Sequence, residues 1–83
     1  MEGLIKMSLI KNFQEFGNQL TELEVECFHK LLSFQNLQPN LTISSLSETL
    51  NVSTTTIFRM VKKLNYKTFM DFRYDLLYHR RDQ

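Results

Sequence analysis

The sequence is poor in the residues that build covalent cross-links, rigid loops and membrane spans. Its 83 residues include one cysteine, one proline, two glycines and no tryptophan. The single cysteine, Cys27, excludes an intrachain disulfide framework and a multi-cysteine zinc site, and it suits a reducing cytosol. No apolar run exceeds three residues, whereas a membrane span needs about 20. An apolar leader with a cleavage site is also missing at the N-terminus, so we expect a cytoplasmic protein without a membrane partner.

The apolar residues that are present suffice for one small core. Hydrophobic residues make up 42% of the chain and aromatic residues 12%, which is too apolar for a disordered tail. A folded chain of this size buries only roughly 60–65% of the surface that its unfolded form exposes. We therefore expect a single domain over residues 1–83.

The small net charge of +1 hides an asymmetry between the two halves of the chain. Residues 1–41 carry three lysines against five glutamates, a net charge of −2. Residues 42–83 carry seven Lys and Arg against four acidic residues, a net charge of +3. No acidic residue lies between Glu48 and Asp71, a stretch that holds four cations. A local basic stripe can bind nucleic acid, but a solvated helix face explains the charge equally well.

The spacing of apolar residues predicts an all-α fold, a compact bundle of five short helices. Three short polar side chains precede apolar helical patterns and are predicted N-caps. These are Thr21, Thr42 and Ser53. Thr21 and Glu24 also have the spacing of a capping box. The first helix is expected to end near Gly17 and the last to begin near Thr68.

Each predicted helix has apolar residues at helical spacing, which we expect to face the core. In the first helix these are Ile5, Leu9, Phe13 and Phe16, and in the third they are Ile43, Leu46 and Leu50. In the fourth helix they are Ile57, Met60, Val61 and Leu64, and in the fifth they are Phe69, Phe72 and Leu76. The second helix has two stripes, Leu23, Cys27, Leu31, Phe34 and Val25, Phe28, Leu32. A helix that is apolar on two sides is expected at the centre of the core or against a second chain.

The third and fourth helices have the pattern of a helix-turn-helix within a homeodomain-like three-helix core. Large apolar residues alternate with a small residue and a turn residue: Leu46, Ser47, Leu50, Asn51, Val52, Ile57 and Met60. Ser47 is small where the helices cross, and Asn51 stands at the corner, where the backbone usually needs a positive φ that Asn tolerates. Unrelated helical hairpins can match this spacing too.

The outward face of the fourth helix supports the helix-turn-helix interpretation. With the apolar residues turned inward, steps of about 100° place Thr55, Arg59 and Lys62 outward. In helix-turn-helix proteins the N-terminal end of this recognition helix, here about residues 54–64, enters the major groove. The residues expected to contact DNA are Ser53, Thr54, Thr55, Thr56, Arg59, Lys62, Lys63 and Lys67. Hydroxyls suit phosphates or base edges, Arg59 suits a guanine, and the lysines suit phosphates.

Simpler roles exist for some of these residues. Ser53 is explained at least in part by N-capping, and Arg59 could be a surface residue. Phe58 lies on a flank of the outward face, and packing against the last helix or a neighbouring chain is favoured over contact with a thymine methyl.

Three stretches resemble the N-terminal domain of RpiR-type transcriptional regulators, which are bacterial proteins. They are residues 20–24 (LTELE), 41–53 (LTISSLSETLNVS) and 55–73 (TTIFRMVKKLNYKTFMDFR). The resemblance implies a helix-turn-helix that binds a double-stranded DNA operator. In that family a sugar-isomerase-like domain follows, which senses a phosphosugar and helps the protein to oligomerise. Ser53, Thr55, Thr56, Arg59 and Lys63 fall at the polar and basic positions of the family's recognition helix.

The chain departs from the family pattern in three ways. Asn51 and Asn65 stand where the family often has glycine, and we expect both turns to survive because Asn tolerates a left-handed backbone. Met60 replaces a usual phenylalanine. The chain ends at Gln83, before an effector domain could begin, so we expect an N-terminal fragment or a naturally short protein.

The sequence does not favour an enzyme, a cofactor or a metal site. His29 and His79 are far apart, and Cys27 and His29 point about 200° apart on a helix, so they cannot share a metal ion. Gly3 and Gly17 are isolated, which leaves no glycine-rich loop for phosphates. We therefore expect no catalytic residue and no metal ligand.

The alternative to a DNA-binding domain is a helical module for protein interaction. The two-sided second helix and the flank formed by Tyr74, Leu77 and Tyr78 favour it, and Phe28 and Tyr74 would then support association. The same surface would also serve a homodimer, which is what two-fold DNA readers require.

Overall fold

Five α-helices and one 3-10 turn make up the computed structural model, which describes residues 9–34 and 37–78. The elements are α1 (Leu9–Phe16), η1 (Gly17–Gln19), α2 (Glu22–Ser33), α3 (Ile43–Leu50), α4 (Thr54–Lys63) and α5 (Phe69–Tyr78). There is no strand within these ranges, and the predicted all-α fold is confirmed. The predicted inward residue Ile5 lies outside the described residues.

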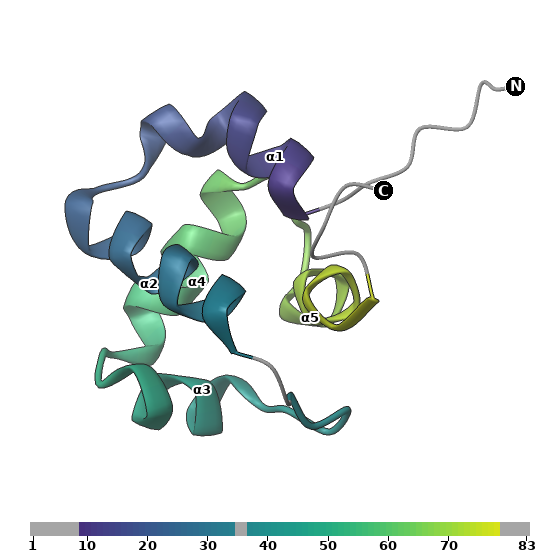
Figure 1. Ribbon diagram of the computed structural model, residues 1–83. Helices are drawn as coiled ribbons and strands as arrows, with labels where there is room; N and C mark the ends of the chain where they lie inside the picture. Colours follow the sequence, from purple (N-terminus) through teal and green to yellow (C-terminus); the bar gives the residue numbers. More distant parts are fainter. Residues whose placement is uncertain (1–8, 35–36, 79–83) are drawn as a thin grey trace, which may run out of the picture.

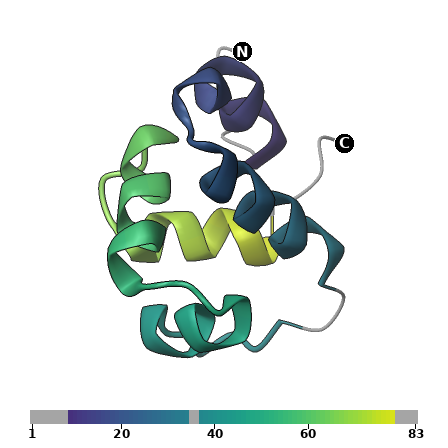
Figure 2. The same cartoon turned by 90° about the vertical axis from the view of Figure 1, so that its left-hand side faces the viewer.

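The helices are arranged so that α4 is in contact with three others. α1 and α3 lie at opposite ends of the molecule, with α2, α4 and α5 between them (Figures 1 and 2). α4 packs against α2, α3 and α5, and α1 packs against α5. The fourth helix is therefore held from several sides, which fixes the direction of its remaining face.

All three predicted N-caps are present. The Thr21 hydroxyl accepts from the Glu24 amide at 3.2 Å, while the Glu24 carboxylate accepts from the Thr21 amide at 2.9 Å. Thr42 exchanges the equivalent pair of hydrogen bonds with Ser45. The Ser53 hydroxyl accepts from the Thr56 amide at 3.1 Å. Each cap satisfies amides that have no partner within the helix, so these helix starts are encoded locally.

The corner between α3 and α4 has the backbone that the sequence predicts. Asn51 ends α3 with φ of 60° and ψ of 45°, a left-handed conformation. The next amide, of Val52, donates back to the Ser47 carbonyl at 3.0 Å, which closes the end of α3. Asn65, after α4, also has a positive φ of 72°. Asn is thus sufficient at both corners, as expected.

The core lies where α2, α3, α4 and α5 meet, and α1 closes one end of it. Outside α2, the fully buried core residues are Leu9 in α1, Leu46 in α3, Ile57, Met60 and Val61 in α4, Leu64 directly after α4, and Phe72 and Leu76 in α5. All were predicted to face inward. Leu50 is almost fully buried as well, whereas Phe13, Ile43 and Phe69 are only partly buried against this core.

The second helix is where the prediction of inward residues is partly wrong. Its buried residues are Glu24, Cys27, Phe28 and Leu31, which form one stripe. Leu32 and Phe34 also pack against the core but are only partly buried. Leu23 is 47% exposed, because it lies beside this stripe in the first turn. The stripe begins with a carboxylate, so α2 brings a charged group to the edge of the core.

Long-range polar contacts tie the helices to one another. The Asn12 amide group donates to the Leu64 carbonyl at 2.8 Å, which joins α1 to the end of α4. Arg73 donates to the Leu41 carbonyl at 2.9 Å, which joins α5 to the segment before α3. The Tyr66 hydroxyl donates to buried Asp75 at 2.6 Å. Burial and this hydrogen bond raise the pKa of Tyr66 well above its usual range, so the phenol stays protonated.

Candidate nucleic-acid interface

The outward face of α4 is the predicted polar and basic face. Ile57, Met60 and Val61 are fully buried, which turns Thr55, Arg59 and Lys62 to the opposite side. All three of these side chains are exposed. The structure thus brings together the residues that were expected to form one surface.

The start of α4 carries the four consecutive hydroxyl residues of the prediction. Ser53 caps the helix, and its hydroxyl also lies 3.0 Å from the Thr56 hydroxyl. Thr54 and Thr55 are exposed, whereas Thr56 is half-buried. The cap therefore uses Ser53 and Thr56, and the hydroxyls of Thr54 and Thr55 face solvent at the positive end of the helix dipole.

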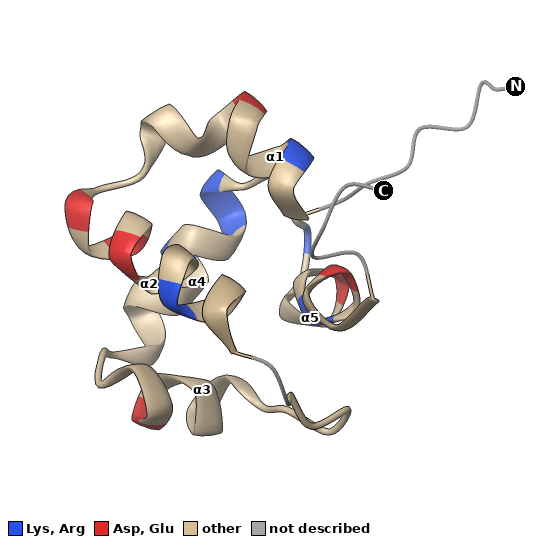
Figure 3. Ribbon diagram, in the orientation of Figure 1, with Lys and Arg blue, Asp and Glu red and all other residues tan. Residues whose placement is uncertain are grey.

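The cations gather around the end of α4. The Lys62 ammonium donates to the Lys67 carbonyl at 2.6 Å, so the chain folds back beside the helix after its last turn. Lys67 is exposed. Figure 3 shows the positively charged segments on α4 and the acidic segments at the start of α2. Arg59, Lys62, Lys63 and Lys67 thus form one basic surface, which includes the two cations of the outward face.

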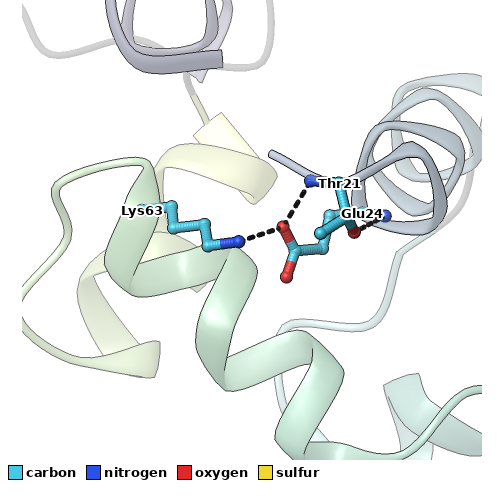
Figure 4. Close-up of polar contacts among 3 residues, drawn as sticks. All are labelled: Thr21, Glu24 and Lys63. Carbon is cyan, nitrogen blue, oxygen red and sulfur yellow. Dashed lines mark hydrogen bonds and ion pairs between the residues drawn. The ribbon is translucent and has the colours of Figure 1, made fainter. Parts of the chain in front are cut away.

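Lys63 differs from the other cations because it reaches the buried stripe of α2. Its ammonium lies 2.9 Å from the Glu24 carboxylate, and 31% of the Lys63 side chain is exposed against 4% of the Glu24 side chain. The same carboxylate oxygen accepts from the Thr21 amide (Figure 4). Glu24 therefore joins the cap of α2 to the last turn of α4, and Lys63 has a structural role in addition to any contact with a ligand.

The ionisation of Glu24 follows from these contacts. Burial raises the pKa of this carboxyl, but the hydrogen bond from the Thr21 amide and the hydrogen bond and charge of Lys63 together lower it by more. The net pKa lies below the ordinary value of 4.5. The folded state thus binds a proton at this site less readily than the unfolded chain does.

We expect the stability of the protein to depend on Glu24 at acidic pH. Because its pKa is depressed on folding, the contribution of Glu24 is present above pH 4.5 and is lost as the pH falls through the folded-state value. Glu24→Gln keeps the size of the side chain and removes the charge. In urea unfolding at a series of pH values, the difference between the wild type and Glu24→Gln should shrink below pH 4.5. A constant difference would contradict the ion pair with Lys63.

Phe58 is an exposed aromatic side chain on the same helix. Its exposed fraction is 48%, so contacts within this chain leave about half of the residue exposed, and packing against a neighbouring chain stays a prediction. With Arg59, Lys62 and Lys63 it lines a shallow hollow of about 420 Å³ on the outer side of α4. Phe58 is therefore part of the surface formed by the predicted site residues.

Only some of the residues that were expected to support protein interaction are exposed. Tyr74 and Tyr78 are exposed by 57% and 62%, and their ring centroids lie 5.1 Å apart on α5. Phe28 is fully buried and stacks on Phe13 at 4.3 Å. The expectation that Phe28 supports association is therefore wrong, since it is a core residue. Leu77 is half-buried.

Of the remaining candidates from the sequence, Cys27 belongs to the core. Cys27 is 2% exposed, and burial raises the pKa of its thiol, which makes it an unreactive core residue as predicted. His29 is exposed and lies near the rings of Phe13 and Phe28. His79 lies outside the described residues. Across the described ranges, no helix is both long and apolar enough to cross a membrane.

Sequence reasoning missed one residue of this region, Glu24. The capping-box spacing identified its contact with Thr21, but its ion pair joins residues 39 positions apart. No local pattern predicts such a contact. The one feature of the sequence that pointed to a role for Glu24 was its position in the first turn of the helix, next to an apolar stripe.

Comparison with family models gives a match that covers most of the chain. The family model described as a helix-turn-helix domain, rpiR family, matches residues 7–80 of the chain. No curated protein and no solved structure gives a significant match. The matched region includes all five helices and the whole outward face of α4.

Proposed function

We propose that this chain, which belongs to the rpiR family of helix-turn-helix domains, binds double-stranded DNA in a sequence-specific manner as the DNA-binding part of a transcriptional regulator. Membership of the family points to such a regulator rather than to an enzyme. The observation that carries the proposal is the outward face of α4, on which hydroxyl and basic side chains stand opposite a fully buried apolar face.

The chemistry of each residue supports a role on DNA. With α4 in the major groove, the exposed hydroxyls of Thr54 and Thr55 reach phosphates or base edges, and Ser53 and Thr56 hold the end of the helix. Arg59 can form two hydrogen bonds with the O6 and N7 atoms of guanine. Lys62, Lys63 and Lys67 neutralise phosphates and release counterions, which makes binding salt-dependent.

The wider biological setting belongs to the same proposal. A homodimer would place two α4 helices about 34–36 Å apart on a two-fold operator, and the exposed Tyr74 and Tyr78 provide a surface for it. Regulation by a phosphosugar would come through a separate sugar-isomerase-like domain, as the family resemblance implies. The setting would be the bacterial cytoplasm.

The proposal is tested by titrating isotopically labelled protein with a short duplex of random sequence. At low salt, we expect amide shifts centred on residues 53–63, because this segment forms the outward face and its helix start. The affinity should fall steeply as salt is raised, with a slope of log K against log salt of about −0.9 for each phosphate neutralised. Lys62→Gln should reduce that slope by about one phosphate equivalent.

The same titration distinguishes the alternative function, a protein-interaction module. Shifts that are absent, or that are confined to α2 and α5, would contradict DNA binding through α4. Lys30→Gln is the matched control for Lys62→Gln, since Lys30 is an exposed lysine on α2. It should leave the salt slope close to that of the wild type.

A further inference from the structure

Phe58 is an exposed apolar residue among the polar and basic residues of α4. Thr54, Phe58 and Lys62 follow one another at intervals of four residues, so they form one row along the helix. Thr55 and Arg59 form the neighbouring row. The aromatic ring thus lies on the flank of the outward face, between a hydroxyl and an ammonium group, with 48% of the residue exposed.

The surroundings of Phe58 define the kind of partner that fits it. Arg59, Lys62 and Lys63 line the same shallow hollow of about 420 Å³. An identical face on a second copy of the chain would bring these cations against each other, which is unfavourable. A fitting partner is therefore an anion that also presents a small apolar group close to its charges.

The major groove of DNA presents this combination of groups. Thymine carries a 5-methyl group there, between rows of phosphates, and Phe is one of the side chains that contact it. Among the four bases, only thymine carries a methyl group at that edge. We propose that Phe58 makes sequence readout specific for thymine by packing on its methyl group, next to the base that Arg59 reads. This inference rests on the proposed function, since it needs α4 to lie in the major groove.

The test uses DNA that differs only by the methyl group. A preferred duplex is first selected from a random library with the wild-type protein, and each thymine is then replaced singly by deoxyuridine. We expect replacement at one position per bound domain to weaken wild-type binding about fourfold, which corresponds to one buried methyl group. This comparison needs no protein variant, so it stands even if a substitution at Phe58 impairs folding.

The protein variant assigns that sensitivity to Phe58. With Phe58→Ala, the thymine and deoxyuridine duplexes should bind with equal affinity, and a new selection should lose the thymine at that position. Met70→Ala is the control, because Met70 is another exposed apolar residue, on α5. It should retain the fourfold difference between the two duplexes.

Every other outcome contradicts the inference, and each one identifies which part of it is wrong. If wild-type binding is insensitive to every deoxyuridine replacement, or if Phe58→Ala keeps the thymine preference, the role of Phe58 is wrong and DNA binding itself stands. If Phe58→Ala changes the mass of the protein in sedimentation and not its thymine preference, Phe58 contacts a second copy. If the wild type binds no duplex at low salt, the inference and the proposed function are both wrong.

Discussion

Reversing the charge of Arg59 (Arg59→Glu) is expected to lower duplex affinity on the order of 100-fold or more at low salt. A bidentate contact with guanine contributes about 1–3 kcal/mol to discrimination, and a carboxylate at the same place adds repulsion from the phosphates. Arg59 is exposed and stands opposite the buried face of α4, so the variant should keep its helical circular dichroism spectrum and its urea midpoint. The measurement is fluorescence anisotropy with a labelled duplex.

Lys30→Glu is the matched control for this variant. It makes the same change in net charge on an exposed residue of α2, and its effect should be limited to a few-fold. Equal losses for both variants would mean that net charge, rather than the outward face of α4, governs binding. An unchanged affinity for Arg59→Glu would show that the recognition face is wrongly assigned.

Truncating Phe72 (Phe72→Ala) is expected to lower the free energy of unfolding by about 3–5 kcal/mol. The side chain is fully buried, and its ring makes an edge contact with Tyr66 at 5.6 Å and a tilted contact with Phe69 at 6.0 Å. Small domains have a total stability of about 5–15 kcal/mol, so this one change removes a large part of it. Urea unfolding followed by circular dichroism measures the loss.

Met70→Ala provides the comparison on the same helix. Met70 is 64% exposed, so its truncation should change the free energy of unfolding by about 0.5 kcal/mol or less. A similar small effect for Phe72→Ala would contradict the position of α5 in the core.

Much of the fold could be predicted because its signals are local. The three N-caps each depend on residues three positions apart, and the left-handed Asn51 is favoured by its own side chain. The inward face of α4 follows from helical periodicity alone. Periodicity also explains the error at Leu23, since it identifies apolar stripes without saying which stripe another helix covers.

The contacts between helices could not be predicted in the same way. Lys63 with Glu24, Asn12 with the Leu64 carbonyl, and Tyr66 with Asp75 depend on how the helices cross. In the candidate site, the residue types and their common face were predictable from spacing. The engagement of Lys63 by a buried carboxylate was not, because its partner belongs to another helix.

The support that α4 receives on its buried side has a consequence for how such a domain evolves. Its buried side is held by the core, and its last turn is held by the hydrogen bond that the Leu64 carbonyl accepts from Asn12 and by the one that Lys63 donates to Glu24. The exposed positions 55 and 59 take no part in that support, whereas Lys62 donates to the Lys67 carbonyl. Exchanges at exposed sites usually change stability by about 0.5 kcal/mol or less. Mutation can therefore diversify the outer chemistry of α4 while selection for a folded chain acts on different residues. The outer chemistry of α4 and the foldability of the chain can therefore change independently.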